Sequence, residues 1–342
     1  MGHRTGDDHS TAAFTDLADL ASSRVGGRAI AANDEFFAPK SNLVNPTAPV
    51  FVPEKFTARG KWMDGWESRR RRTPGHDWCV VALGMRGVVR GVNVNTRFFT
   101  GNFPSHCAID ALDSPRPLRR SVCHEPGAPW VTLVPQSPLC GDCDNFFPVH
   151  DDRPWTHLRL NIFPDGGVAR LRAYGEATID WKAIARRGTR IDLASICSGG
   201  LVVAASDMHF GARDNMIMPG RAVNMGDGWE TRRRRGPGFD WAIVRLGARG
   251  RVTRVEIDTN HFKGNYPESA SLEGCMAEHR TVESLARERW MEILSRTRLR
   301  PHHRHFFSRG LADVGPVTHV RLNIFPDGGI SRLRVHGLVA KD

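Results

Sequence analysis

Short runs of alternating apolar and polar residues recur along this chain, without long helical periodicity. Between Val92 and Thr96, and again between Val255 and Thr259, every second residue is apolar. A strand with one face against a core has this period of two. Gly, Pro and Asn separate the runs at short intervals, as is typical of turns. The pattern therefore predicts an all-β chain whose short strands pack as a sandwich or jelly roll.

The most regular of these strand patterns runs into a turn. Leu158, Leu160 and Ile162 alternate with polar residues, and Pro-Asp-Gly-Gly follows at residues 164–167 before a second apolar run. Glycine adopts the positive φ angles that tight turns need. We expect a β-hairpin here and another around residues 326–329, where the same four residues return.

Long segments of the chain occur twice. Residues 64–78 read DGWESRRRRTPGHDW and return at 227–241 with 12 of 15 positions identical. Residues 156–172 read THLRLNIFPDGGVARLR and return at 318–334 with 14 of 17 positions identical. Matches of this length indicate an internal duplication.

The spacing of the copies indicates that the repeated unit is a whole domain. A third pair of segments, starting at Asp19 and Asp192, is offset by 173 residues, and the other two pairs are offset by 163 and 162. Solenoid repeats run to about 20–50 residues, so this unit is too long for a solenoid. Each copy is long enough to fold around its own core.

The duplication sets the domain boundaries that we expect. The stretch Thr178–Arg187 has the strongest helical pattern and lies where the copies join. We therefore expect a flexible N-terminal segment, a first jelly-roll repeat, a linker and a second jelly-roll repeat, at residues 1–17, 18–176, 177–190 and 191–342.

Composition narrows the class of protein. Of 342 residues, 40% are apolar, which suffices for a buried core. No apolar run reaches the roughly 18–20 residues that cross a bilayer, and the first residues are polar, unlike a signal peptide. The seven cysteines are an odd number spread over the chain, which is no disulfide framework. We expect a cytoplasmic protein with no membrane partner.

The charge balance raises the hypothesis of nucleic-acid binding. The chain has 48 Lys and Arg against 37 Asp and Glu, a net charge of +11. Such binding predicts a continuous positive stripe. Only six of the 48 basic residues are lysine, however, and arginine equally suits sites that grip carboxylates. No nucleic-acid motif occurs, so we expect a small-molecule substrate and no nucleic-acid partner.

Acidic residues beside arginines form the first group of candidate site residues. Asp64 and Glu67, and in the second copy Asp227 and Glu230, precede runs of four arginines. Two interpretations stay open. The charges could form a structural lattice of salt bridges. Alternatively, they could surround an anionic polar substrate, whose carboxylate arginine binds through two parallel hydrogen bonds.

Two further groups of polar residues recur in both copies. His157 and His319 occupy matching positions, and each is either a general base or a buried core histidine. Loops at strand ends are where a β scaffold normally carries its site. The polar residues at such ends are Asn95, Asn102, Asp258 and Asn265.

Motifs for metal or redox chemistry are incomplete. Cys140 and Cys143 have the spacing of half a zinc site, but zinc needs two more ligands. The cluster of His302, His303 and His305 is either a transition-metal site or a solvated loop. Motifs for hydride transfer, phosphoryl transfer and serine hydrolysis are absent.

Several segments together resemble allantoicase, the allantoate amidinohydrolase of purine breakdown. They are ANDEFFAPKSNLV, GKWMDGWESRRRR, RFFTGNFP and THLRLNIFPDGG, and the resemblance extends from about residue 18 to residue 340. It implies two tandem jelly-roll repeats of the galactose-binding-like kind and a homo-oligomer. It also implies hydrolysis of allantoate to ureidoglycolate and urea, in allantoin degradation.

Allantoate carries a carboxylate and two ureido groups on one carbon. Its hydrolysis needs an acid to protonate the departing nitrogen and a base to take a proton from water or from the other ureido N–H. Our candidates for acid and base are Asp64, Glu67 and His157, with counterparts Asp227, Glu230 and His319. Our candidates for substrate binding are Arg69 and Arg97 for the carboxylate, Asn95 and Asn102 for the ureido groups, and their counterparts Arg232, Asp258 and Asn265.

The sequence leaves three questions open. The repeats differ, for example where Arg97 faces Asn260, so the site lies in one half, between halves or between subunits. A divalent metal is a candidate cofactor, because Asp34, Asp64 and Glu67 could cluster, although no ligand spacing demands one. The alternative function is that of a non-catalytic jelly-roll protein that binds a small polar or sugar ligand.

Overall fold

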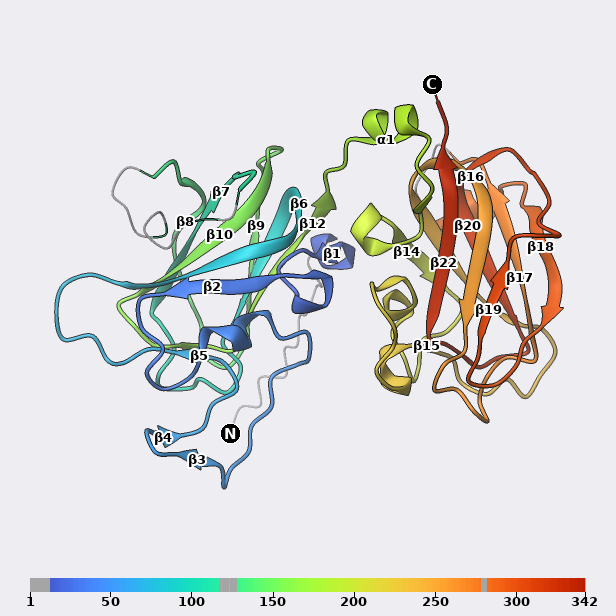
Figure 1. Cartoon of the computed structure of the whole chain (residues 1–342). Helices are drawn as coiled ribbons and strands as arrows, with labels where there is room; N and C mark the ends of the chain where they lie inside the picture. The colour runs from blue at the N-terminus through green and yellow to red at the C-terminus, as the bar shows by residue number, and fades with distance from the viewer. Residues whose placement is uncertain (1–12, 117, 119–122, 124–127, 278–281, 342) are drawn as a thin grey trace. The chain divides into compact units, whose positions relative to one another are not determined.

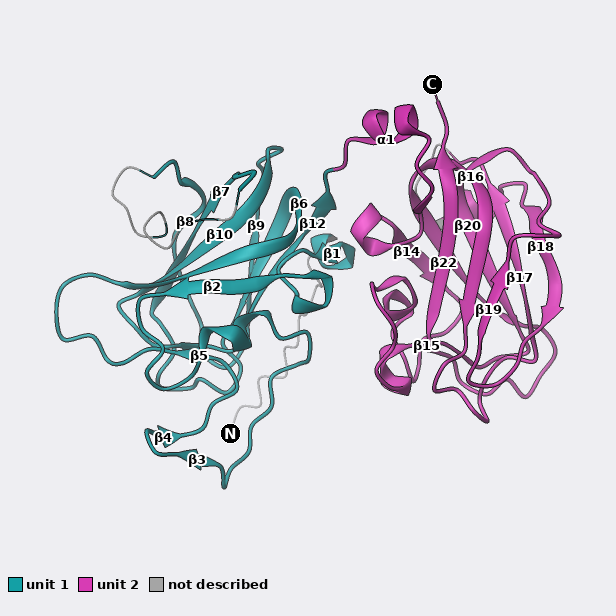
Figure 2. Cartoon of the chain, viewed as in Figure 1, with its two compact units in different colours: residues 1–178 teal, residues 179–342 magenta. Residues whose placement is uncertain are grey.

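The predicted strands form two units, each built around one unusually long strand (Figure 2). The chain divides between Thr178 and Ile179. The long strands are β6 (Asp77–Asn95) in unit 1 and β16 (Asp240–Asp258) in unit 2. This computed structural model describes residues 13–116, 118, 123, 128–277 and 282–341. Most of the predicted N-terminal segment therefore lies outside the described residues.

The strands follow one another in the same order in both units, except that β3 and β4 occur only in unit 1 (Figure 1). The strands of unit 1 are β1 (Ala18–Asp19), β2 (Arg28–Ala32), β3 (Phe56–Thr57), β4 (Gly60–Lys61), β5 (Trp66–Glu67), β6, β7 (His106–Leu112), β8 (Val131–Pro138), β9 (Asp144–Pro148), β10 (Pro154–Phe163), β11 (Gly167–Val168) and β12 (Arg170–Ala177). Those of unit 2 are β13 (Ile191–Asp192), β14 (Leu201–Ala205), β15 (Trp229–Glu230), β16, β17 (Ser269–Cys275), β18 (Met291–Arg298), β19 (Arg304–Phe307), β20 (Pro316–Phe325), β21 (Gly329–Ile330) and β22 (Arg332–Val339). The α-helices are α1 (Trp181–Arg187) and α2 (Val282–Leu285).

The long strand of each unit takes part in both layers of a sandwich. The first half of β6 pairs with β2 and β10, and its second half pairs with β9 and β12. From there one layer continues through β7 to β8, and the other continues to β1. In unit 2, β16 pairs in the same way with β14, β20, β19 and β22. The predicted fold of two tandem jelly-roll β-sandwiches is confirmed.

The core follows the alternation that the sequence predicts. Val92 and Val94 of β6 are fully buried between the layers. Asn93 and Asn95, on the opposite face of the strand, are also buried, and the neighbouring strand β9 pairs with this part of β6. Both amides donate to Oδ1 of Asp144 in β9, at 2.7 and 2.6 Å. The two amide N–H donors on this face are therefore satisfied by a partner strand, whereas Oδ1 of Asn93 is buried without a hydrogen-bond partner among the described residues.

The predicted hairpins are wrong. β10 and β12 do not pair with each other, because each pairs with β6, which lies between them. The turn at residues 164–167 instead carries the chain from one layer to the other. A Cβ atom on Gly167 would lie 1.9 Å from the ring of Phe99, so this close packing requires glycine. Gly329 packs in the same way on Phe262 in unit 2.

The stretch between the repeats contains the predicted helix. α1 lies inside the range 178–187 expected for it, which confirms that prediction. The side chain of Asp180 accepts a hydrogen bond from the backbone N–H of Ala183, and Gly188 ends the helix with a left-handed conformation. In the described part of the chain, no helix combines the length and the apolar character needed to cross a membrane.

A buried arginine anchors the segment that leads to β5. Arg170 is 1% exposed, and its Nη2 lies 2.7 Å from Oδ2 of Asp64. Its other nitrogens donate to backbone carbonyls, including those of Asp64 and Thr47. In unit 2, Arg332 makes the same ion pair with Asp227 at 2.9 Å. These pairs join the start of the last long strand of each unit to the loop before β5 or β15.

We expect Arg170→Met to lower the free energy of unfolding of unit 1 by about 3–5 kcal/mol, because it leaves the largely buried Asp64 carboxylate without its cation. Urea unfolding followed by tryptophan fluorescence measures this loss. The matched control is Arg86→Met, which removes an ion pair to Asp113 whose two side chains are 44% and 35% exposed. That variant should lose at most about 1 kcal/mol. Equal losses in the two variants would contradict the anchoring role of Arg170.

Candidate functional site

Glu67 lies at the edge of the unit 1 sandwich, held by backbone pairing on both sides. β5 pairs with β11 through Glu67 and Gly167, and Glu67 also forms a bridge to Ala38. Its neighbour Trp66 is fully buried and fixes the short strand to the core. Glu67 is 9% exposed, and its carboxylate accepts a hydrogen bond of 2.6 Å from the side-chain amide of Asn102. The structure thus brings two of the predicted site residues together.

The surroundings of Glu67 favour its protonated form. Burial raises the pKa of this carboxyl group above its ordinary value, and the hydrogen bond from Asn102 offsets the rise only in part. A carboxylic acid with a raised pKa keeps its proton to higher pH and can give it to a substrate. Glu67 is therefore suited to act as a general acid.

A cavity of about 410 Å³ opens beside Glu67, a volume within the range of small-molecule sites. Aromatic and aliphatic side chains form much of its wall, and a few polar groups converge on it. The lining residues are Phe37, Phe51, Lys61, Met63, Glu67, Phe98, Thr100, Asn102 and Asp142.

The wall with Phe51 and Lys61 comes from a segment that the second copy lacks. The backbone N–H of Val50 donates to Asp64 fourteen positions later, at 3.0 Å. The equivalent contact in unit 2 joins Val223 to Asp227, only four positions later, at 3.1 Å. Unit 1 therefore has ten additional residues here, and they include the small sheet of β3 and β4.

Asp142 is held at the cavity by a strained turn. Phe98 and Asp142 both have positive φ angles, 69° and 52°, and the N–H of Phe98 donates to Oδ1 of Asp142 at 2.7 Å. In unit 2, the N–H of His261 donates to Nδ1 of His302 at 2.8 Å, and these two residues also have positive φ angles. The second copy thus has an imidazole where the first has a carboxylate.

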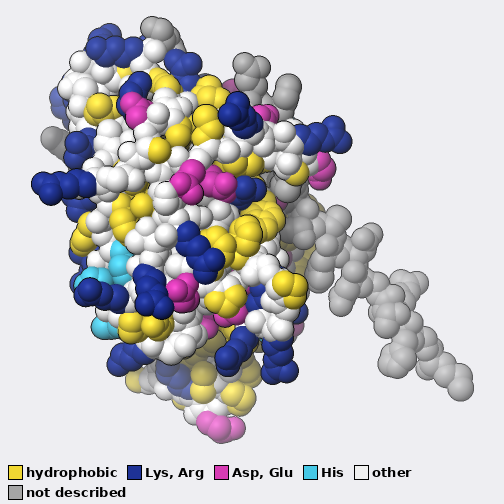
Figure 3. All heavy atoms as spheres, turned by 90° about the vertical axis from the view of Figure 1, so that its right-hand side faces the viewer, with side chains coloured by type: hydrophobic (Ala, Val, Ile, Leu, Met, Phe, Trp, Pro, Cys, Tyr) yellow, Lys and Arg dark blue, Asp and Glu magenta, His cyan; other side chains and the backbone are white. Residues whose placement is uncertain are grey.

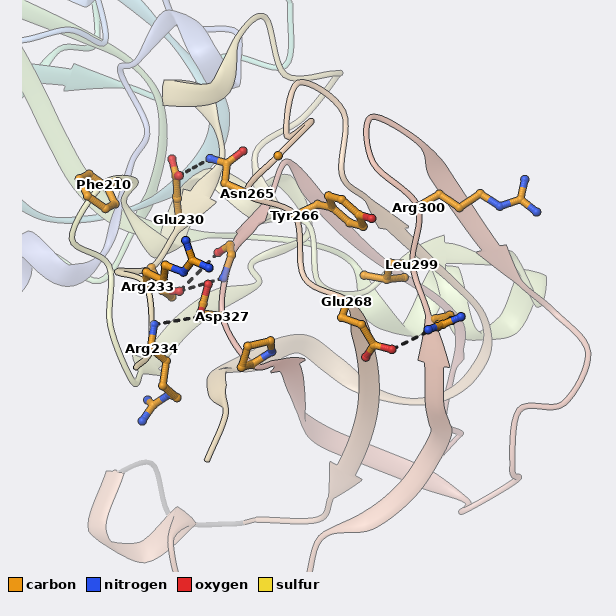
Figure 4. A pocket seen from close by; sticks show the side chains of 15 residues that line it. Phe210, Glu230, Arg233, Arg234, Asn265, Tyr266, Glu268, Leu299, Arg300 and Asp327 are labelled. Carbon is orange, nitrogen blue, oxygen red and sulfur yellow. Dashed lines mark hydrogen bonds and ion pairs between the residues drawn. The ribbon is translucent and has the colours of Figure 1, made fainter. Parts of the chain in front are cut away.

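The corresponding cavity of unit 2 is larger and rich in arginine. Asn265 donates to the carboxylate of Glu230 as Asn102 does to that of Glu67. Figure 4 shows this pair above the side chain of Arg233. The cavity has a volume of about 1050 Å³, and its charged lining residues are Glu230, Arg233, Arg234, Glu268, Arg298, Arg300 and Asp327.

Other predicted residues have structural partners outside these cavities. Asp64 and Asp227 form the buried ion pairs described above. Arg69 and Arg232, each about two-thirds exposed, pair with Asp34 and Asp207 at 2.7 and 3.1 Å. Neither arginine lines the cavity beside Glu67 or Glu230. For these residues the structure supports the salt-bridge interpretation of the acidic and basic segment.

Asn95 and Asp258 cap matching turns at the ends of the long strands. Oδ1 of Asn95 accepts from the N–H of Arg97 at 3.0 Å, and Oδ1 of Asp258 accepts from the N–H of Asn260 at 2.8 Å. Burial, together with the nearby charge of Glu256, raises the pKa of Asp258. The side chain of Arg97 is exposed and does not line the Glu67 cavity.

The structure does not bring the predicted histidines to the cavities. His157 lies inside β10, where Nδ1 is 2.8 Å from the hydroxyl of Thr156, and burial lowers its pKa. The end of β10 nearest the Asn102 loop is Phe163, whose carbonyl accepts from Ser105. His157 is six residues earlier, roughly 20 Å along the strand. His319 is equally far from the end of β20 and likewise contacts the threonine that precedes it, at 3.0 Å.

Within the described part of the chain, acidic and histidine residues do not converge on a metal-ligand set. Among the residues that the structure describes, no three His, Cys, Asp or Glu side chains are placed to share a metal ion. Asp34 pairs with Arg69, and Glu67 bonds to Asn102. In the histidine cluster, His303 and His305 have ring centroids 4.9 Å apart, but Nε2 of His305 accepts from a backbone N–H.

Figure 3 shows how basic side chains are distributed on one face of the molecule. Lysine and arginine side chains are interspersed there with acidic and apolar ones. Several arginines are paired with carboxylates, such as Arg321 with Glu273 at 2.7 Å. This face does not carry the continuous positive stripe that nucleic-acid binding predicts.

Sequence reasoning missed most of the residues that line the cavities, including the charged residues Asp142, Lys61 and Arg233. Asp142 lies between Cys140 and Cys143, in a motif noticed only for its thiols. Lys61 lies in the ten additional residues, which the change of offset from 173 to 163 could have revealed. Arg233 is one of four consecutive arginines, and the sequence cannot distinguish which of them faces a cavity.

Comparisons with known proteins agree on one family. The family model for the allantoicase repeat matches residues 18–178 and 191–340. A probable allantoicase from Burkholderia pseudomallei is 50% identical and covers 97% of this chain and 98% of its own. A second, from Pseudomonas paraeruginosa, is 48% identical over 96% and 98%. The crystal structure of allantoicase from Saccharomyces cerevisiae is similar with a TM-score of 0.80 at 33% identity, covering 94% of this chain and 93% of its own.

We expect Asn102→Leu to raise the pKa of Glu67 further, because leucine keeps water out of the site but offers no hydrogen bond to the carboxylate. A ¹³C NMR titration of glutamate side-chain carboxyl groups measures this pKa, with Glu67→Gln to assign the signal. Asn265→Leu, the matched change in unit 2, should leave the Glu67 titration unchanged. A constant or lowered pKa in Asn102→Leu would contradict the assigned hydrogen bond.

Proposed function

This chain belongs to the allantoicase family, a hydrolase that converts allantoate and water to ureidoglycolate and urea, and we propose that the Glu67 cavity of unit 1 carries out the reaction. One observation supports this choice of cavity above all. The cavity combines an acid of raised pKa, Glu67, with a second carboxylate, Asp142, and a cation, Lys61. In unit 2, His302 replaces Asp142, and the segment that contains Lys61 is missing.

The lining side chains match the groups of allantoate. Lys61 binds the substrate carboxylate; its Nζ lies 4.9 Å from the centre of the Phe51 ring, beside the carbonyl of Val52. Phe51 and Phe98 are stacked with centroids 5.7 Å apart, and they shield the reacting carbon from water. Asn102 still has its amide oxygen free of protein donors among the described residues, and this oxygen accepts a ureido N–H.

The two carboxyl groups can then act in opposite senses. Glu67 donates its proton to the departing ureido nitrogen as the bond from that nitrogen to the central carbon breaks, which releases urea. Asp142 takes the N–H proton of the remaining ureido group, so that a C=N double bond forms. Water then adds across this bond, with hydroxide on carbon and a proton on nitrogen, and gives ureidoglycolate. A proton returned from Asp142 to Glu67 restores the site.

We expect Glu67→Gln to lower urea release by roughly 10²–10⁴-fold, the usual contribution of a general acid. The matched variant Glu230→Gln should keep turnover close to that of the unchanged protein. The measurement is urea formed from allantoate over time, with and without a chelator, and circular dichroism verifies that both variants are folded. The chelator arm tests the divalent metal that the sequence left open.

Two results would sink this assignment. Full activity in Glu67→Gln together with loss in Glu230→Gln would move the chemistry to unit 2. Binding of allantoate without urea release by the unchanged protein, with metal supplied, would favour the alternative function of a non-catalytic binding protein.

The assembly and location are part of the proposal. The resemblance to allantoicases supports a homo-oligomer, which sedimentation equilibrium would detect as a mass above 38.1 kDa. The seven cysteines are all free thiols, as a reducing cytoplasm would keep them. A monomer at micromolar concentration would contradict the first part of this proposal.

A further inference from the structure

The second copy keeps the pair of glutamate and asparagine but changes the groups around it. Asn265 donates to Glu230 in the arrangement found in unit 1. His302 stands in place of Asp142, and the residues that present Lys61 are missing. Unit 2 therefore keeps the glutamate and asparagine that can bind a ureido group, but it lacks the carboxylate and the lysine that the proposed reaction needs.

Arginines have replaced neutral residues on the far wall of this cavity. The strand register pairs Arg298 with Ser269 in unit 2, and Pro138 with His106 at the matching place in unit 1. Arg298 therefore stands where unit 1 has proline. Two residues further on, Arg300 stands where unit 1 has a cysteine. The change gives the unit 2 cavity an excess of cations, four arginines against three carboxylates.

Arg233 is the arginine best placed to bind a ligand. Arg233 lines the cavity, and Figure 4 shows its side chain just below the carboxylate of Glu230. Among the described residues, no carboxylate forms an ion pair with Arg233, whereas Arg298 lies 3.2 Å from Glu268. A guanidinium without an acidic partner at the wall of a cavity is suited to a carboxylate ligand.

We propose that the unit 2 cavity is a second binding site, which takes a small carboxylate with a ureido or amide group and does not hydrolyse it. Arg233 binds the carboxylate through parallel hydrogen bonds, Glu230 accepts an N–H of the ureido group, and Asn265 accepts another through its amide oxygen. The ligand class rests on the proposed function, because the same glutamate and asparagine face the substrate in unit 1.

The other two carboxylates of this cavity, Glu268 and Asp327, already accept hydrogen bonds from protein groups. The hydroxyl of Ser269, together with Arg298 and Arg296, lowers the pKa of Glu268 to about 2, so this carboxylate is a weak base and a poor acceptor for an N–H proton. Asp327 accepts the backbone N–H of Arg234 at 2.8 Å. Neither group is placed to serve as the second partner in proton transfer, which explains binding without hydrolysis.

Titration calorimetry of the full chain with N-carbamoylglycine tests this site. That compound carries one carboxylate and one ureido group, and it lacks the second ureido group that leaves in the reaction. We expect two molecules bound per chain. Arg233→Met should weaken one site by roughly 10- to 100-fold, the value of a charge-assisted contact. Lys61→Met should weaken the other site, and the exposed neighbour Arg235→Met should weaken neither.

Binding that Arg233→Met leaves unchanged would overturn the unit 2 site. If Arg233→Met removes a site while Lys61→Met changes nothing, the unit 2 site stands and the placement of the carboxylate in unit 1 fails. Failure of the catalytic proposal is separate from both results, because it is measured as urea release by Glu67→Gln.

Discussion

The buried ion pair between Arg170 and Asp64 is the contact on which the site in unit 1 depends. A guanidinium that is 1% exposed is tolerated only when its donors are satisfied, and here a carboxylate and several backbone carbonyls satisfy them. The contact spans 106 positions and fixes the chain just before β5. Glu67 follows three residues later, so its position against Asn102 is set by a charge pair that does not itself face the cavity.

The two units share the residues that position the glutamate and differ in the loops around it. Both units hold an anchoring arginine, a short strand with a buried tryptophan, and a glutamate bonded to an asparagine. The differences lie in loops, where a change of length or residue type disturbs no core contact. Ten additional residues and one carboxylate distinguish the Glu67 cavity, while arginines distinguish the Glu230 cavity. One scaffold thus supports two electrostatic environments.

Local sequence patterns predicted the strands, whereas contacts between residues distant in the sequence decided how the strands pair and which residues form the site. The alternation at Val92 and Val94 identified a buried strand, because successive side chains of a strand point to opposite faces and apolar residues at every second position mark the buried one. The hairpin after Ile162 was wrong because a turn sequence cannot reveal that β6 inserts between the strands it connects. Asp64 was a reasonable acid by type, but its partner Arg170 is distant in the sequence. Lys61 escaped notice because a search for residues shared by both copies cannot find one that only a single copy has.

The contrast between the cavities also gives a physical reason why the two units would differ in function, with proton donation in unit 1 and anion binding in unit 2. Aromatic walls with few charges disfavour an ionised carboxyl group, and this is the setting that raises the pKa of Glu67. Guanidinium groups stabilise anions, and this is the setting around Arg233 and Arg298. The proposed site in unit 1 uses the single cation Lys61 for the substrate carboxylate, and additional guanidinium groups there would favour the ionised form of Glu67 and weaken it as a proton donor. Duplication removes the conflict, because each copy can adapt its loops to one task while the shared sandwich keeps the glutamate and asparagine in register.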